Sequence, residues 1–259
     1  MILDRFKVTG KVAIVTGAGR GIGQGSALAL AEMGANVVCA ARTREQIEET
    51  ADKASTFGVK ALAVPCDVSE HAQLENVVAE AMKQFGRIDI LVNNAGGSMP
   101  KAALGTSEEM FNAAFQFNVT TAFAMTRLVV PHMQASGGGA IVNISSAAGR
   151  LIAPGFAAYG TAKCALSFLT KLLGCEFAPT VRVNAIAVGS TLTSALAPFL
   201  SGEMRGQMEA LTPMRRLGEV EDIALMVLYL ASPASSWITG KIFEVDGGTE
   251  STNWPFAPF

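Results

Sequence analysis

The sequence is poor in the residues that build metal centres and disulfide frameworks. It has two histidines and four cysteines in 259 residues, with no Cys-x-x-Cys pair and no histidine at metal-ligand spacing from a cysteine. We expect His71 and His132, which fall in helix-like segments, at helix ends or on the surface. We expect buried free thiols, rather than metal ligands or disulfides, at Cys39, Cys66, Cys164 and Cys175.

Charge and long apolar runs are also scarce. Charged residues make up 16% of the chain, and 20 Lys and Arg against 22 Asp and Glu leave a net charge of −2. This balance offers no basic stripe for nucleic acid and no polybasic arm for membranes. The purest apolar run, residues 223–231, is about half as long as a bilayer crossing requires. The first 20 residues contain no signal-peptide core, so we expect a cytoplasmic protein with neither membrane nor nucleic-acid partners.

What the chain does contain is an alternation of short apolar runs and longer amphipathic stretches. The apolar runs are rich in Val, Ile and Ala, as in parallel strands covered on both faces. They span residues 12–16, 36–41, 61–65, 88–93, 140–145, 181–187 and 242–245. Helix-like stretches span residues 22–33, 44–57, 72–85, 108–133, 157–177 and 220–230. The alternation predicts a single Rossmann-type α/β domain over residues 1–259, with a doubly wound, seven-stranded parallel sheet and helices on both faces.

A glycine-rich turn follows the first predicted strand and leads directly into a helix. Glycines there let backbone N–H groups and a helix N-terminus approach a pyrophosphate. The position between a strand and a helix, near the start of the chain, favours dinucleotide binding over a chance glycine turn. The candidate binding residues are Gly17, Gly19, Arg20, Gly21, Ile22 and Gly23.

The end of the second predicted strand bears on which nicotinamide cofactor is bound. An acidic residue there would bind the ribose 2′-hydroxyl of NAD(H), and a basic one would accept the 2′-phosphate of NADP(H). Arg42 and Thr43 follow the strand, and no carboxylate occurs before Glu45. Because Arg42 and Arg20 could both contact a phosphate, we expect NADP(H) to be preferred, with NAD(H) as the other candidate. The alternative for Arg42 is a solvated side chain that only ends the strand.

A Tyr-x-x-x-Lys pair opens the helix after the fifth predicted strand. Tyr159 and Lys163 share one helix face because they are four residues apart. A free phenol has a pKa of about 10, and a nearby ammonium or an oxidised nicotinamide ring would favour the phenolate. The hydroxyl of Ser146 could hold a substrate oxygen, and Asn118 could sustain a water relay to Lys163. Since ligands bind beyond the carboxyl ends of parallel strands, we expect these groups to converge there.

Together these motifs resemble those of the short-chain dehydrogenase/reductase family, of the classical type, over nearly the whole chain. The resemblance implies that Tyr159 is the general acid/base and that Ser146 positions the carbonyl or hydroxyl. It implies that Lys163 lowers the pKa of the tyrosine and holds the ribose, and that Asn118 completes a proton relay. The adenine ring and the rest of the cofactor would contact Asp67, Val68, Asn94, Ala95 and Gly96.

The resemblance also bears on which members of the family are most similar and on the oligomeric state. Residues 93–101 and 232–240 resemble bacterial 7α-hydroxysteroid dehydrogenases, and the remainder is equally similar to 3-oxoacyl-(acyl carrier protein) reductase-like proteins. The family resemblance implies a homotetramer with residues 108–133 and 157–177 as interface helices. One departure is Val188, which replaces the proline usual after the sixth strand and brings a backbone N–H and a freer φ. The cofactor contacts expected from this loop are Gly189, Thr191 and Thr193.

Two segments do not belong to the regular alternation. Residues 191–213 form a helical insertion, which we interpret as a substrate lid, the alternative being a helix packed on the body. Its apolar residues are Leu196, Phe199, Leu200, Met204 and Met208. The tail, residues 253–259, holds three aromatic residues and no charge, and we expect it to pack on the site or on another subunit.

The sequence therefore predicts an NADP(H)-dependent oxidoreductase that interconverts a secondary alcohol and a ketone on a hydrophobic small molecule. Hydride would transfer at nicotinamide C4 and the tyrosine would act as acid/base. One alternative is an NAD(H)-dependent hydroxysteroid dehydrogenase. A non-catalytic dinucleotide-binding sensor is a second alternative, against which the intact set of Asn118, Ser146, Tyr159 and Lys163 argues.

Overall fold

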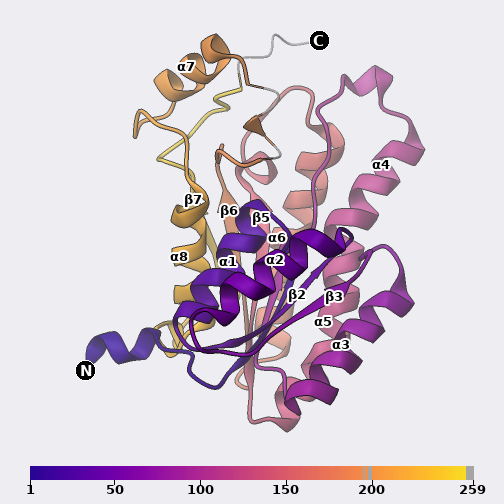
Figure 1. Ribbon diagram of the computed structural model, residues 1–259. Coiled ribbons are helices and arrows are strands. Elements are labelled where there is room, and N and C mark those ends of the chain that lie inside the picture. Colours follow the sequence, from indigo (N-terminus) through magenta and orange to yellow (C-terminus); the bar gives the residue numbers. More distant parts are fainter. Residues whose placement is uncertain (195, 198–199, 255–259) are drawn as a thin grey trace.

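A parallel sheet lies at the centre of the molecule. The computed structural model describes residues 1–194, 196–197 and 200–254. The sheet has seven strands in the order β3-β2-β1-β4-β5-β6-β7 (Figure 1). Its strands are β1 (Val12–Thr16), β2 (Asn36–Ala41), β3 (Ala61–Pro65), β4 (Ile90–Asn93), β5 (Gly139–Ser146), β6 (Val181–Val188) and β7 (Ile242–Val245). The strand order reverses between β1 and β4, and this switch point opens a crevice at the carboxyl ends of the strands.

Helices cover both faces of this sheet, as predicted. One apolar core joins the sheet to α1 (Gly21–Glu32), α2 (Arg44–Ser55) and α8 (Val220–Ala231). A second core joins the other face to α3 (His71–Phe85), α5 (Thr121–Ala135) and α6 (Ala157–Glu176). Successive residues of β1 alternate between the two cores and all are buried, which explains the continuous apolar runs in the sequence.

Several shorter helices lie between these elements and near the N-terminus. The short helix at the N-terminus projects from the body, and α7 stands near the C-terminal end of the described chain (Figure 1). These elements are η1 (Ile2–Phe6), η2 (Ala103–Gly105), α4 (Glu108–Phe115), η3 (Gln116–Thr120), η4 (Ala147–Gly149), α7 (Gly202–Leu211) and η6 (Pro233–Ser235).

The prediction of one continuous helix over residues 108–133 is wrong. A π-helical turn, η3, separates α4 from α5, and the Thr121 N–H bonds the carbonyl of Gln116 five residues back. Asn118 lies within this turn and its Nδ2 donates to the carbonyl of Ala114 at 2.8 Å. An apolar pattern of period 3.6 continues through one inserted residue, so the sequence does not reveal the interruption.

Two of the four cysteines are also not where we expected them. Cys39 and Cys66 are buried, and burial raises the pKa of their thiols to about 12 and about 11. Cys164 and Cys175 are exposed on α6. They are about three helical turns apart and so share a face, which is the face pointing away from the sheet.

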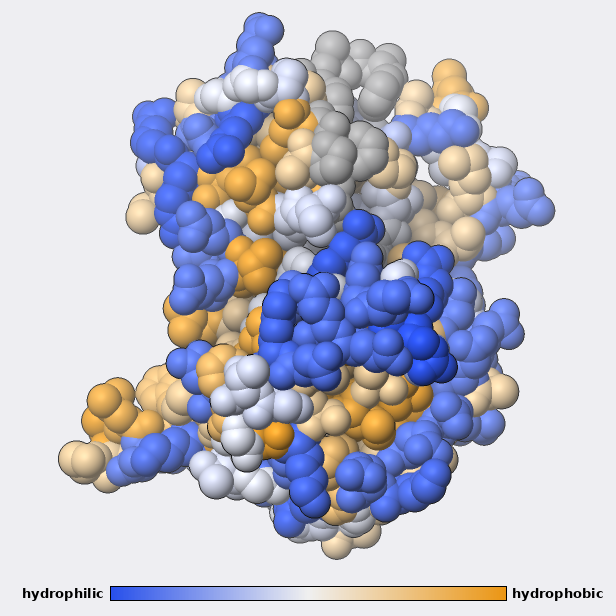
Figure 2. Space-filling view, viewed as in Figure 1, coloured by the Kyte–Doolittle hydropathy of each residue, from blue (hydrophilic) through white to orange (hydrophobic). Residues whose placement is uncertain are grey.

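The surface explains where the apolar residues of this weakly charged chain lie. Figure 2 shows hydrophilic side chains over α2, which buries only Ile47, Thr50, Ala51 and Ala54 against the body. The apolar share is largely enclosed in the two cores on either side of the sheet. Among the helices of the described ranges, none is long and apolar enough to cross a membrane.

Candidate active site

The glycine turn after β1 forms one end of a cavity of about 990 Å³. Gly17 and Gly21 have φ of 65° and 55°, a region that favours glycine. A Cβ on Gly23 would lie 2.2 Å from the carbonyl oxygen of Gly17, so only glycine lets α1 pack directly on the turn. No side chain caps α1 at Arg20, which leaves the first N–H groups of the helix for water or an anion. This end of the cavity fits the pyrophosphate of a dinucleotide.

Two arginines lie beside this turn and line the same cavity. Arg42 follows β2 and Arg20 belongs to the glycine turn, and both are exposed. Within the described part of the chain, neither forms an ion pair. Asp67 lines the cavity after β3, and its Oδ1 accepts a hydrogen bond from the Ser69 N–H at 2.9 Å. The end of β2 therefore presents a guanidinium that is not in ion-pair contact with any carboxylate of the described residues.

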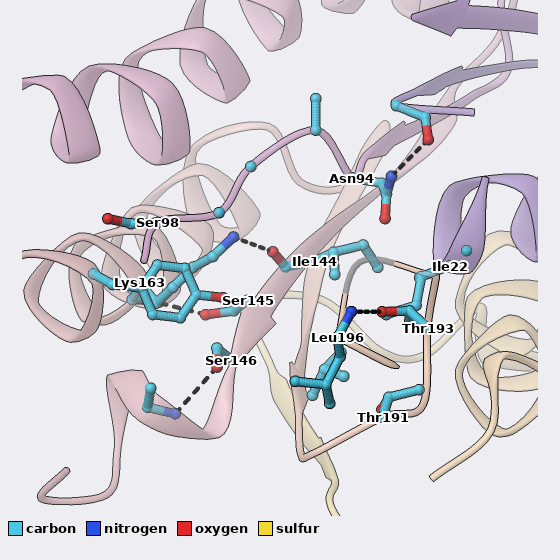
Figure 3. Close-up of a pocket in the computed structure, with 18 of the residues that line it drawn as sticks. Ile22, Asn94, Ser98, Ile144, Ser145, Ser146, Lys163, Thr191, Thr193 and Leu196 are labelled. Atoms are coloured by element: carbon cyan, nitrogen blue, oxygen red, sulfur yellow. Dashed lines mark hydrogen bonds between the residues drawn. The ribbon is translucent and has the colours of Figure 1, made fainter. Parts of the chain in front are cut away.

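The ends of β1 and β4 are locked together at the switch point. The Thr16 hydroxyl accepts hydrogen bonds from the backbone N–H groups of Asn94 (3.0 Å) and Ala95 (3.1 Å). The side-chain amide of Asn94 donates in return to the carbonyls of Thr16 (2.9 Å) and Gly17 (3.2 Å). Figure 3 shows Asn94 and Ile22 across the cavity from Lys163 and Ser146. The middle of the cavity thus has a rigid polar wall made by two loops.

The opposite wall carries the polar groups from β5 and α6. Tyr159 and Ser146 both line this wall, and the Ser146 hydroxyl is close enough to the phenol to affect its pKa. The Ser146 Oγ also accepts from the Ala148 N–H at 3.2 Å. Lys163 is 3% exposed, and its Nζ donates to the carbonyl of Ile144 at 2.8 Å (Figure 3). The same Nζ lies 5.7 Å from the centroid of the Tyr159 ring. The predicted Ser, Tyr and Lys therefore meet at one place on the cavity wall.

Burial sets the ionisation of these groups. It raises the pKa of the Tyr159 hydroxyl, and the nearby Ser146 hydroxyl only partly opposes this. It also lowers the pKa of Lys163 to about 8. In the protein by itself, the cost of desolvating a phenolate is the larger effect at Tyr159. At neutral pH Tyr159 is accordingly a neutral phenol that can donate a proton.

Asn118 lies behind the cavity rather than in its wall. It is 1% exposed, its Oδ1 accepts from the Gly97 N–H at 2.8 Å, and its Nδ2 donates to the Gly97 carbonyl at 3.0 Å. A Cβ on Gly96 would lie 2.7 Å from the Asn118 Oδ1 and 3.1 Å from the Lys163 Nζ. The side chain thus holds the loop after β4 against Lys163. Of the predicted site residues, Asn118 and Gly23 lie outside the cavity wall, and all the others line it.

The lid region and the C-terminal segment complete the lining of the cavity. Gly189, Thr191 and Thr193 line it, as do Leu196 and Met204 of the predicted lid. Met208 is fully buried and Leu200 half-buried, and neither lines the cavity, while Phe199 falls outside the described residues. Sequence analysis missed several lining residues because loops with no polar motif give no signal. These are Met99, Leu151, Phe156, Thr249 and Thr252.

The fold and this cavity together define a Rossmann-type protein whose site is built to hold a dinucleotide beside a small molecule. Residues 17–250 match a family model described as enoyl-(acyl carrier protein) reductase. An uncharacterized oxidoreductase of Mycobacterium tuberculosis is 49% identical over 98% of this chain and 97% of its own length. The 7α-hydroxysteroid dehydrogenase of Escherichia coli K12 is 37% identical over 95% of this chain and 96% of its own length.

A solved structure of a similar protein also matches this fold. A 7α-hydroxysteroid dehydrogenase complexed with NADH and 7-oxo glycochenodeoxycholic acid matches with a TM-score of 0.93 and 37% identity. The match covers 96% of this chain and 98% of that one. This chain belongs to the short-chain dehydrogenase/reductase family and is an oxidoreductase.

Proposed function

We propose that the protein is an NADP(H)-dependent oxidoreductase that interconverts a secondary alcohol and a ketone on a hydrophobic small molecule. The observation that carries the proposal is the convergence of Ser146, Tyr159 and Lys163 on one wall of the cavity that begins at the glycine turn. The glycine turn and the uncapped N-terminus of α1 would hold the pyrophosphate. These three side chains would lie beside a bound nicotinamide, which would supply or accept a hydride.

In the reduction direction, the hydroxyls of Ser146 and Tyr159 hold the substrate carbonyl oxygen. Tyr159, a neutral phenol, donates its proton as charge develops on that oxygen, and in oxidation it takes the proton back. Lys163 lies behind the tyrosine, where its ammonium stabilises the phenolate that proton donation leaves. Asn118 keeps the loop after β4 packed against Lys163 and would serve the proton relay from that position.

The preference for NADP(H) is supported by the two exposed arginines at the end of the cavity. Arg42 replaces the acid that would bind a free ribose 2′-hydroxyl, and Arg20 lies in the adjacent turn. Thr43, Asp67 and Val68 would complete the adenosine end of the site.

We further propose a single domain with residues 191–213 as its lid, acting in the cytoplasm as a homotetramer. The lid is supported by Leu196 and Met204, which face the cavity. The tetramer is supported by large apolar side chains exposed on the two predicted interface regions, and native mass spectrometry would test it. These side chains are Phe111, Phe115, Phe123, Phe168 and Leu172.

The second candidate is an NAD(H)-dependent hydroxysteroid dehydrogenase. It is favoured by the similarity to 7α-hydroxysteroid dehydrogenases, one of which was solved with NADH and a 7-oxo bile acid. Initial rates with NADPH and NADH on a panel of steroid ketones, acyl thioester ketones, quinones and sugars would separate the two candidates. A higher kcat/KM with NADH on a steroid ketone would decide for the second.

Substitution of the tyrosine tests the chemistry. Tyr159→Phe removes the proton donor but keeps the ring, so kcat should fall at least about 100-fold while NADPH still binds. The chain holds only two tyrosines, and Tyr229→Phe on α8 is the matched control, which should retain activity. Turnover would be followed by NADPH absorbance and binding by NADPH fluorescence. Full activity in Tyr159→Phe, or a wild-type protein inactive on every ketone, would contradict the proposal.

A further inference from the structure

Residues 246–254, which we call the C-terminal strap, lie against the site and contribute Thr249, Thr252, Asn253 and Trp254 to the cavity wall. Arg150, just beyond the loop of Ser146, holds its first half. The guanidinium of Arg150 donates to Asp246 (3.0 Å), to the carbonyl of Thr249 (2.7 Å) and to Glu250 (2.9 Å). Because three groups of the strap bind one side chain, the strap is fixed relative to the loop that carries Ser146.

The second half of the strap is fastened to the lid region. Asn253 is 5% exposed, its Oδ1 accepts from the Ser190 hydroxyl at 2.8 Å, and its Nδ2 donates to the Thr212 hydroxyl at 2.9 Å. Ser190 immediately precedes the predicted lid, and Thr212 lies at its far end. A single buried amide thus joins both ends of the lid to the strap and fixes the residue that follows it, Trp254.

Trp254 brings an aromatic side chain to the cavity wall next to the catalytic group. Its ring meets Phe156 edge-on, with centroids 5.4 Å apart, and Phe156 lies 6.1 Å from the ring of Tyr159. All three residues line the cavity. A substrate whose carbonyl is held by Tyr159 would lay its carbon skeleton along Phe156 and Trp254.

The chemistry of this end of the cavity restricts what it can recognise. The described lining residues of the 147–156 loop, the lid region and the strap carry no charge. They offer apolar side chains, such as Leu151, Leu196 and Met204, with a few hydroxyls and one amide. Aromatic rings provide large apolar contact with few rotatable bonds, and they suit a flat, rigid partner that loses little conformational entropy.

We propose that Trp254 is a substrate-binding residue that makes the protein selective for neutral ketones with fused rings. This inference deepens the oxidoreductase function proposed above and rests on it. Trp254 contacts the part of the substrate remote from the carbonyl, and the strap and lid hold it there through Asn253. A single-ring ketone, bound at Tyr159, is too short to gain much from that contact.

The kinetic test compares 2-decalone, with two fused rings, and cyclohexanone, with one. Trp254→Ala should raise KM for 2-decalone about tenfold, the effect of one lost aromatic contact, and leave kcat and KM for cyclohexanone within about twofold. The matched control is Trp237→Ala, since Trp237 is the other tryptophan and is 99% exposed. Equal effects of Trp254→Ala on both ketones, or no effect on either, would overturn the proposal.

A binding test separates this inference from the proposed reaction. In Trp237→Phe the sole tryptophan is Trp254, and with saturating NADP⁺ a ketone can bind but cannot be reduced. Titration with 2-decalone should change the emission of this variant and leave that of Trp254→Phe unchanged. No response in the first variant overturns the subsite. A response there from a protein that never oxidises NADPH would support the subsite and refute the proposed reaction.

Discussion

The proposed preference for NADP(H) rests on the exposed guanidinium of Arg42, and Arg42→Ala tests this directly. Arg42 lines the cavity at the end of β2 and makes no ion pair within the described ranges, so its removal leaves no protein charge unpaired. A solvent-exposed contact with a phosphate is worth less than a buried one, and Arg20 remains beside it. We therefore expect kcat/KM for NADPH to fall about tenfold and kcat/KM for NADH to be unchanged within about twofold.

The assay measures initial rates with both cofactors at one saturating ketone concentration and at two ionic strengths. Added salt should weaken the NADPH preference of the wild type more than that of Arg42→Ala, because screening acts on the phosphate contact. Arg44→Ala is the matched control, since Arg44 is exposed nearby but is paired with Glu48 at 3.3 Å and does not line the cavity. Equal losses with NADPH and NADH, or the same loss in Arg44→Ala, would refute the reasoning.

Two further predictions concern stability. Burial raises the pKa of Asp89, but hydrogen bonds from Arg87, the Val12 N–H and Lys11 outweigh it and hold the pKa below its ordinary value. The carboxylate therefore stabilises the fold above about pH 4, and this stabilisation is lost as pH falls through the lowered pKa. Urea unfolding at pH 7 should show Asp89→Asn less stable by about 2–3 kcal/mol, a deficit that narrows in acid, and exposed Asp52→Asn nearly unchanged. A stability difference between the wild type and Asp89→Asn that does not change with pH would contradict the expected lowering of the Asp89 pKa. Gly23→Ala should lower Tm and weaken NADPH binding, because its Cβ would meet the Gly17 carbonyl oxygen at 2.2 Å. In α7, a Cβ on Gly206 would meet no described atom within 4 Å apart from its own helix backbone, so Gly206→Ala should raise stability by up to about 1 kcal/mol. Equal effects of the two alanines would refute the packing argument.

Much of the architecture was predictable because it depends on local patterns. The apolar runs at β1 and β2 and the glycine turn between β1 and α1 are short-range signals, and the structure places them as expected. The π-helical turn at η3 was not predictable from the apolar pattern, and its Asn118 amide bonds Gly97, 21 residues away in the sequence. The exposure of Cys164 and Cys175 likewise depends on which face of α6 meets the sheet.

Some features of the candidate site were likewise predictable from the sequence, and others were not. Ser146, Tyr159 and Lys163 carry a recognisable spacing, and their meeting at the carboxyl ends of the strands follows from parallel topology. The direction in which the pKa of Tyr159 shifts could not be predicted from the sequence, because desolvation depends on all the groups packed around its hydroxyl. Phe156 and Trp254 are almost 100 residues apart, and no spacing rule joins them.

By itself, the sequence determined the parallel α/β fold, the glycine turn and the identity of the polar groups at the site. These follow from periodicity, turn chemistry and side-chain type, which act over a few residues. Only the tertiary structure decided that Arg42 has no described ion-pair partner, that desolvation raises the pKa of Tyr159, and that the strap brings Trp254 to the cavity. Each of these depends on contacts between distant segments, and such contacts exist only once the chain has folded.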